Sequence, residues 1–263
     1  MDLGITGKVA VVAAASEGLG RAAAEALAAE GANLVICSRD RTRIEGTAAE
    51  LRRSHAVDVK SFVCDVTDAE SVARFREAVF DTHKAAHILF TNAGGPPSGG
   101  VEEFAEADFL QALRLNLLSA IHLVREFLPQ MKKQAYGRII ALTSISVKQP
   151  LPTLALSNVA RVGVVAYIKS IATAVSHLNI TANTLAPGYF LTDRVKELLS
   201  DMAKRDGISE EEALAAITAS IPAKRVGAPE ELGALVAFLA SEQAGYISGD
   251  TILIDGGMYQ GLM

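Results

Sequence analysis

The sequence predicts a doubly wound α/β fold, in which a parallel sheet of about seven strands carries helices on both faces. Short apolar runs alternate with helical stretches along the whole 263-residue chain, and this alternation is typical of parallel strands joined by right-handed crossovers. The runs are almost continuously apolar, as expected of strands buried on both faces. No linker, repeat or low-complexity segment divides the chain, so we expect residues 1–263 to form a single domain.

The apolar runs and the periodic stretches place the individual elements. Strands are expected at residues 8–14, 33–38, 59–64, 87–91, 138–143, 180–185 and 251–254. Helices are expected at 18–30, 40–53, 68–82, 108–133, 154–177 and 229–240. Pro129 should bend or end the fourth helix, because proline lacks the N–H that a helix interior requires. The Gly- and Pro-rich segment 92–100 should be a loop.

One segment stands outside this alternation. Residues 192–221 read as two short helices split near Gly207, and such an insertion suits a lid over a site at the carboxyl ends of the strands. The lid mixes apolar and basic side chains, which favours an apolar or mixed substrate. These side chains are Val195, Leu198, Leu199 and Met202 beside Lys196 and Lys204.

Composition and charge narrow the class of protein. The chain has 25 basic and 30 acidic residues, for a net charge of −5, and no basic stripe, so nucleic-acid binding is not expected. Cys37 and Cys64 lie in apolar runs without metal-ligand spacing, which indicates buried thiols and no metal site. No signal peptide or membrane-length apolar run is seen, so we expect a cytoplasmic protein with no membrane partner.

A glycine turn follows the first expected strand. Ser16, Gly18, Leu19 and Gly20 lie where this strand leads into the first helix. The free backbone N–H groups and the dipole of a helix N-terminus attract anions such as a pyrophosphate. A strand, a glycine turn and a helix in this order are typical of a Rossmann fold that binds a dinucleotide.

With this turn and its later motifs, the chain resembles the short-chain dehydrogenase/reductase family over essentially its whole length. Its tail is similar to that of 3-oxoacyl-carrier-protein reductase-like members, with motifs at 225–231, 247–249 and 255–257. The resemblance implies an NAD(P)-dependent oxidoreductase, a small-molecule carbonyl or alcohol substrate, and a homotetramer. The chain departs from the family turn at Ala13 and Ala14, which replace Thr and Gly.

The resemblance also implies the contacts of the cofactor. Asp65 and Val66 match the adenine-contacting pair, although Asp65 could instead be a turn residue. The floor of the site would be Asn92, Ala93 and Gly94, and the nicotinamide carboxamide would contact Pro187, Gly188 and Thr192.

The end of the second expected strand bears on the choice between NAD and NADP. Arg39 follows Ser38 there, and an arginine suits the extra phosphate of NADP. Asp40 and Glu17 oppose this assignment because both are acidic. The alternative for Arg39 is a solvated loop charge. We expect NADP, with NAD possible.

The catalytic positions depart most from the family. Ser144 matches the family serine and Asn116 the assisting asparagine, but the tyrosine and lysine are replaced by Ser157 and Arg161. Spacing of four places Ser157 and Arg161 on one helix face. Arg161 can bind ribose hydroxyls but cannot relay a proton as lysine can, and an aliphatic hydroxyl is a far weaker acid than a phenol. The proton donor is therefore the missing element.

Three substitutes for the proton donor are open: Tyr189, Lys148, and a water held by Ser157. Tyr189 follows Pro187 and Gly188, and Lys148 lies in the loop after Ser144. Two functions also stay open, because a fold does not decide function. One is an oxidoreductase with an atypical active site. The other is a dinucleotide-binding protein without redox turnover, such as a sensor or a structural subunit.

Overall fold

The computed structural model, which describes residues 2–262, contains the expected seven-stranded parallel sheet. The strands lie side by side in the order β3-β2-β1-β4-β5-β6-β7. They are β1 (Val9–Ala13), β2 (Asn33–Ser38), β3 (Val59–Val63), β4 (Ile88–Thr91), β5 (Gly137–Leu142), β6 (Ile180–Pro187) and β7 (Thr251–Ile254). Each end agrees with the expected bound to within two residues. The predicted doubly wound fold is therefore confirmed.

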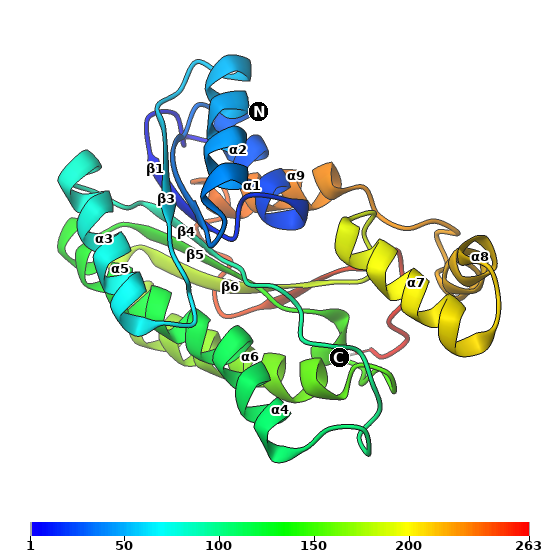
Figure 1. Ribbon diagram of the computed structural model, residues 1–263. Helices are drawn as coiled ribbons and strands as arrows, with labels where there is room; N and C mark the ends of the chain where they lie inside the picture. The colour runs from blue at the N-terminus through cyan, green and yellow to red at the C-terminus, as the bar shows by residue number, and fades with distance from the viewer. Residues whose placement is uncertain (1, 263) are drawn as a thin grey trace.

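Helices cover both faces of the sheet (Figure 1). One face carries α1 (Gly18–Ala29), α2 (Arg41–Ser54) and α9 (Pro229–Ala240), and the other carries α3 (Ala69–His83), α5 (Ser119–Gln134) and α6 (Ala155–Val175). Two short 3-10 turns, Ile145–Val147 and Ser176–Leu178, flank α6.

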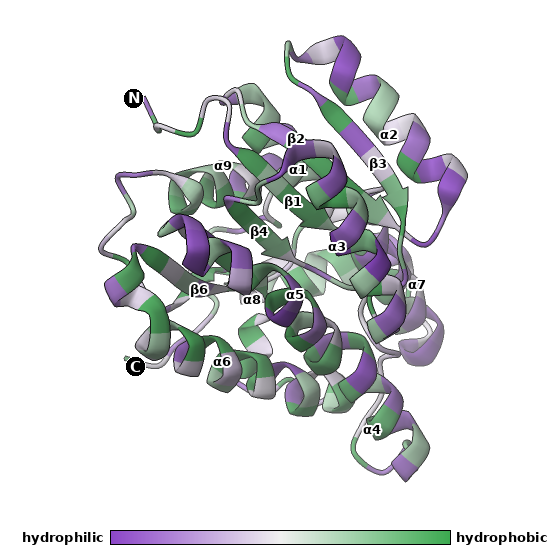
Figure 2. Ribbon diagram, turned by 90° about the vertical axis from the view of Figure 1, so that its left-hand side faces the viewer, coloured by the Kyte–Doolittle hydropathy of each residue, from purple (hydrophilic) through white to green (hydrophobic). Residues whose placement is uncertain are grey.

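The strand pleat divides the core into two apolar layers. Along β1, Ala10 and Val12 belong to the layer under α1 and α9, whereas Val9 and Val11 belong to the layer under α5 and α6. This is the alternation that a strand imposes. The central strands β1 and β4 are accordingly hydrophobic along their length in Figure 2. Every residue of both strands is buried.

The expected helix at 108–133 is interrupted rather than uniform. It consists of α4 (Glu106–Ala112), a π-helical segment η1 (Leu113–Leu118), and α5. Pro129 lies inside α5 and does not end it, so of the two expected effects, a bend or an end, the end is wrong. Arg125, whose carbonyl loses its N–H partner to Pro129, is exposed, as is Pro129 itself, so water can satisfy this carbonyl.

The segment expected as a lid, 192–221, forms two helices split at Gly207, as expected. Helices α7 (Asp193–Asp206) and α8 (Glu210–Ser220) stand apart from the two layers, beyond the ends of the strands (Figure 1). Gly207 ends α7 in the left-handed conformation, with φ at 67°, which glycine adopts without steric cost. The two helices pack on each other through a small apolar cluster of their own.

Helix α6 is apolar and long. By length and composition the stretch Ala155–Leu178 could cross a membrane. In the structure it packs on β6 and on η1, and it buries Val164, Ile168 and Val175 in the core layer. Its apolar character is therefore explained by its place against the sheet.

The site is positioned by the reversal of strand order between β1 and β4. The chain leaves β1 toward one side of the sheet and leaves β4 toward the other. The two connections diverge there and open a crevice at the carboxyl ends of the strands, where ligands of such sheets bind.

A tight contact at this crevice makes Gly20 sensitive to substitution. A methyl group at Gly20 would overlap the carbonyl oxygen of Ala14. We therefore expect Gly20→Ala to lower the free energy of unfolding by about 2–3 kcal/mol. Urea denaturation measures this change.

Gly46 provides the matched control. It lies inside α2 with no atom within 4 Å of an added Cβ. Gly46→Ala should therefore raise the free energy of unfolding by about 0.5–1 kcal/mol. Equal stability of the two variants would contradict the close packing at Gly20.

Candidate active site

A large cavity follows the carboxyl ends of the strands and runs under the lid. Its volume is about 410 Å³. It brings together most of the residues that the sequence singled out. These are Ser16, Gly18, Leu19, Arg39, Asp65, Val66, Asn92, Ala93, Gly94, Ser144, Ser157, Arg161, Pro187, Gly188 and Thr192. Gly20 and Asn116 lie behind its wall.

The glycine turn presents backbone N–H groups to this cavity. No side chain caps α1, although Asp40 caps α2 and Asp68 caps α3. The first N–H groups of α1 therefore remain available to an anion. Gly18 opens the helix with φ at 56°.

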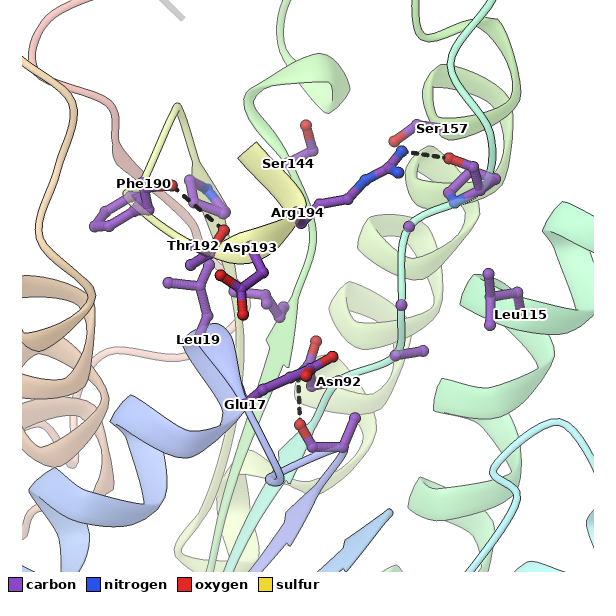
Figure 3. Close-up of a pocket in the computed structure, with 18 of the residues that line it drawn as sticks. Glu17, Leu19, Asn92, Leu115, Ser144, Ser157, Phe190, Thr192, Asp193 and Arg194 are labelled. Carbon is purple, nitrogen blue, oxygen red and sulfur yellow. Dashed lines mark hydrogen bonds between the residues drawn. The ribbon is translucent and has the colours of Figure 1, made fainter. Parts of the chain in front are cut away.

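Ala14 occupies the position where the resemblance calls for glycine. Its backbone is left-handed, with φ at 49°, and the methyl group makes this conformation cost roughly 1–2 kcal/mol. The turn thus keeps its shape despite the substitution. The Nδ2 group of Asn92 donates to the Ala14 carbonyl over 3.4 Å, and this bond joins β1 to β4 across the crevice (Figure 3).

Charges at the end of β2 are arranged around Arg43, which the sequence analysis missed. Arg43 contacts Glu17 at 2.7 Å and lies 3.7 Å from Asp40. Asp40 also accepts from the Arg43 backbone N–H. Arg39 lines the cavity, is exposed, and makes no ion pair among residues 2–262. Both acids that opposed an arginine site are therefore engaged by Arg43.

Asp65, for which the sequence left open a role as a turn residue, lies in a turn after β3. Its Oδ1 accepts from the backbone N–H and the hydroxyl of Thr67, at 2.9 and 2.8 Å. Asp65 is thus a turn residue that also lines the cavity. Cys37 and Cys64 are buried free thiols, as expected.

The serine positions sit at the end of β5 and on the first turn of α6. Ser144 caps the turn at Ile145–Val147 by accepting from the Ser146 N–H at 3.1 Å. Ser157 is buried and accepts from Arg161 Nε, also at 3.1 Å. Because Arg161 occupies a lone pair of this hydroxyl, the Ser157 proton is free to be donated elsewhere.

Arg161 is a buried cation held by neutral groups. It donates to the carbonyls of Leu142 and Thr143, at 3.3 and 3.0 Å. No carboxylate pairs with it in the described part of the chain. Burial, and secondarily the charge of Arg194, lower the pKa of Arg161 to about 10, so the guanidinium stays charged at neutral pH. The site therefore carries an uncompensated positive charge.

Asn116 lies on the π-helical segment and faces a second, smaller cavity. Its Nδ2 group donates to the Gly94 carbonyl at 3.0 Å, while its Oδ1 is buried without a partner among the described atoms. The small cavity, of about 10 Å³, is also lined by Thr91, Ser119 and Arg161. Its size and polarity suit about one water molecule. Asn116 is thus placed beside Arg161 rather than in the main cavity.

The structure separates the candidate proton donors. Lys148 is exposed and does not line the cavity, so the hypothesis of a lysine donor there is wrong. Tyr189 lines the cavity and also packs on the lid cluster. Burial raises the pKa of Tyr189, which makes it a weaker acid than a free phenol.

Arg194 is a second residue that the sequence analysis missed. It lies in the first turn of α7, and its guanidinium donates to the Pro96 carbonyl at 2.6 Å and contacts Glu197 at 3.3 Å. Figure 3 shows it pointing toward Ser157. The sequence offered only its proximity to Thr192, because the contact with Pro96 joins segments 98 residues apart.

The apolar lid residues divide into two groups. Val195 and Leu198 line the cavity, as an apolar contact to a substrate requires. Leu199 and Met202 do not line the cavity and pack in the cluster between α7 and α8, to which Val195 also belongs. Only the first pair is thus available to a ligand.

Comparison with known proteins agrees with this arrangement. Residues 13–259 match the family described as Enoyl-(Acyl carrier protein) reductase. The chain is 32% identical to dehydrogenase/reductase SDR family member 4 of Bos taurus, over 95% of this chain and 86% of that protein. It is 33% identical to the 3-oxoacyl-[acyl-carrier-protein] reductase of Haemophilus influenzae, over 96% and 98%.

A solved structure is similar over the full length. The L-sorbose reductase of Gluconobacter frateurii, complexed with NADPH and L-sorbose, superposes with a TM-score of 0.95. It is 34% identical in sequence, and the match covers 100% of both chains.

Proposed function

This chain belongs to the short-chain dehydrogenase/reductase family, and on that premise we propose that it is an NADP-preferring oxidoreductase with an atypical catalytic site. It transfers hydride between the nicotinamide and a small-molecule carbonyl or alcohol substrate. The observation that supports this best is the continuity of the cavity. One cavity joins the uncapped start of α1 to Ser144, Ser157 and Arg161.

The preference for NADP is supported at the end of β2. Arg39 is exposed there and has no acidic partner among residues 2–262, while Glu17 and Asp40 are engaged by Arg43. A free guanidinium suits the 2′-phosphate that distinguishes NADP from NAD. The similar L-sorbose reductase is also described with NADPH.

The residues present fit a bound NADP. The pyrophosphate would lie on the N–H groups at Gly18 and Leu19, the adenine beside Asp65 and Val66, and the nicotinamide near Pro187, Gly188 and Thr192, all of which line one cavity. The buried Asn116 Oδ1, which has no partner among the described atoms, faces the small cavity and can accept from a water held there.

When bound, the reduced cofactor would supply the hydride for reduction of a carbonyl group. Ser144 and Ser157 donate hydrogen bonds to the carbonyl oxygen, and Arg161 stabilises the negative charge that develops on it. Arg161 also binds ribose hydroxyls in place of the family lysine. The proton then comes from water at Ser157, and the hydroxide left behind takes up a proton from solvent. Lys148 lies outside the cavity, and burial weakens Tyr189 as an acid.

The second candidate is a dinucleotide-binding protein without redox turnover. The substitutions at Ser157 and Arg161 favour it, because together they remove the phenol and the lysine of the family. The left-handed backbone of Ala14 adds strain to the glycine turn, where the pyrophosphate would bind. The lid over the cavity favours the enzyme instead, since it encloses more than a cofactor alone requires.

Assembly and location are proposed on the family resemblance. A homotetramer is supported by exposed apolar side chains at Leu118 on η1 and at Val159 and Val162 on α6, which an interface would cover. A cytoplasmic location, with no membrane or nucleic-acid partner, stays a prediction from the sequence.

Titration and turnover together test the function. NADPH and NADH binding is measured by fluorescence, followed by oxidation of the reduced cofactors with ketones and 3-oxoacyl thioesters. Tighter binding of NADPH, with turnover on a carbonyl compound, is the expected result. Binding without turnover on any carbonyl would support the sensor or structural subunit, and the absence of binding would contradict both candidates.

Arg39 allows a sharp test of the NADP preference. Arg39→Ala should weaken NADPH binding about tenfold or more, because a charge-assisted bond to phosphate is lost, and should leave NADH binding unchanged. Arg41→Ala is the matched control, since Arg41 pairs with Glu45 and does not line the cavity. A loss of affinity shared by both cofactors, or by both variants, would remove Arg39 from the 2′-phosphate site.

Restoring the family residues tests the missing proton donor. Ser157→Tyr combined with Arg161→Lys should raise the reductase kcat on a simple ketone by about 100-fold, since a positioned general acid contributes this much. Arg161→Lys alone should give no such gain, because it supplies no acid at position 157. An unchanged kcat in the double variant would show that proton delivery does not limit the reaction.

A further inference from the structure

Two arginines, Arg161 and Arg194, line the cavity at its Ser157 end, and among the described residues no acid that lines the cavity pairs with either of them. Resting on the proposed oxidoreductase function, we propose that the carbonyl substrate carries a carboxylate, and that Arg194 on the lid binds this carboxylate. The substrate is then an oxo acid, or the corresponding hydroxy acid in the reverse direction.

The acidic residues that line the cavity are all engaged elsewhere. Glu17 pairs with Arg43 at 2.7 Å, and Asp193 pairs with Lys196 at 2.8 Å. The other two acids, Asp40 and Asp65, cap α2 and hold the turn at Thr67. None of the four forms an ion pair with Arg161 or Arg194 within the described residues.

Two arginines at the substrate end of the cavity, Arg161 and Arg194, are not paired with any of these four acids. Arg161 is buried beside Ser157 and held by neutral groups. Arg194 enters from the lid, and its guanidinium points toward Ser157 in Figure 3. Asp193, the residue before it, points instead toward the side of Leu19 and Glu17. A carbonyl compound placed at Ser144 and Ser157 therefore meets a cation and no carboxylate.

Arg194 keeps the capacity to bind an anion. One terminal nitrogen donates to Pro96 and the other contacts Glu197 at 3.3 Å. The side chain of Glu197 is 66% exposed, so this ion pair is solvated and weak. A substrate carboxylate inside the cavity would be screened less than the exposed Glu197 carboxylate. The guanidinium can bind it through two parallel N–H groups.

The position of Arg194 on the lid should make the site select acids over neutral ketones. Its bond to Pro96 ties the lid to the loop that follows β4. A substrate whose carboxylate binds Arg194 and whose carbonyl oxygen binds Ser157 would contact both the lid and the first turn of α6. A neutral ketone makes only the second contact, so the acid should be favoured over its ester.

Matched acids and esters test the proposal. The probes are 3-oxobutanoate and 4-oxopentanoate, each compared with its methyl ester. Two readouts are taken: kcat/KM for NADPH oxidation, and calorimetric binding to the protein loaded with NADP⁺, which cannot reduce the probe. For at least one pair, the acid should exceed the ester by about 10- to 100-fold in both readouts.

Three variants separate the carboxylate contact from other effects. Arg194→Gln should abolish the preference for the acid, and Arg194→Lys should restore part of it. Lys196→Gln removes the same charge from the same helix but faces Asp193, and should keep the preference. Ser98→Ala removes the other described side-chain bond between loop and lid, to Asp201 at 3.3 Å, and should change acid and ester equally.

The outcomes distinguish this proposal from the proposed function. Ketone turnover with equal acid and ester values would overturn the proposal and leave the oxidoreductase in place. Acid binding that depends on Arg194, without NADPH oxidation, would support the carboxylate site and contradict the oxidoreductase. A preference that survives Arg194→Gln, or no binding of any acid, would also overturn the proposal.

Discussion

The reversal of strand order between β1 and β4 is the constraint on which the site depends. Parallel strands direct all their carboxyl ends to one edge, and the connections diverge at this one place. Ala14 and Asn92 follow the two central strands, and their hydrogen bond joins the walls of the crevice. The phosphate turn, the catalytic positions and the lid are all arranged around it.

Electrostatics gives this site its particular character. A buried arginine is costly unless it is paired, yet Arg161 is surrounded by a hydroxyl and two carbonyls. These neutral acceptors satisfy the donors at Nε and Nη1 without cancelling the charge. Charge left uncompensated in a low-dielectric cavity favours an anion or a developing oxyanion. Where the family resemblance implies a lysine able to relay protons, Arg161 provides a fixed positive charge.

The glycine turn between β1 and α1 tolerates an alanine, Ala14, in a left-handed backbone conformation. Ala14 is held left-handed, although its methyl group disfavours this conformation. The Ala14 carbonyl accepts a hydrogen bond from Asn92 and packs closely on Gly20. These two contacts hold the backbone of the turn in place. Strain of this kind persists where surrounding contacts fix the conformation.

The sequence alone determined the fold, the order of the strands along the chain and the lid, because these follow from local periodicity and from glycine placement. It also placed Ser157 and Arg161 on one helix face, since spacing of four sets this. It could not reveal that Arg43 pairs with both acids near Arg39. Nor could it reveal that α5 continues through Pro129, or that Arg194 donates to the Pro96 carbonyl. These depend on which surfaces face water and on contacts between distant segments, which only the tertiary structure decides.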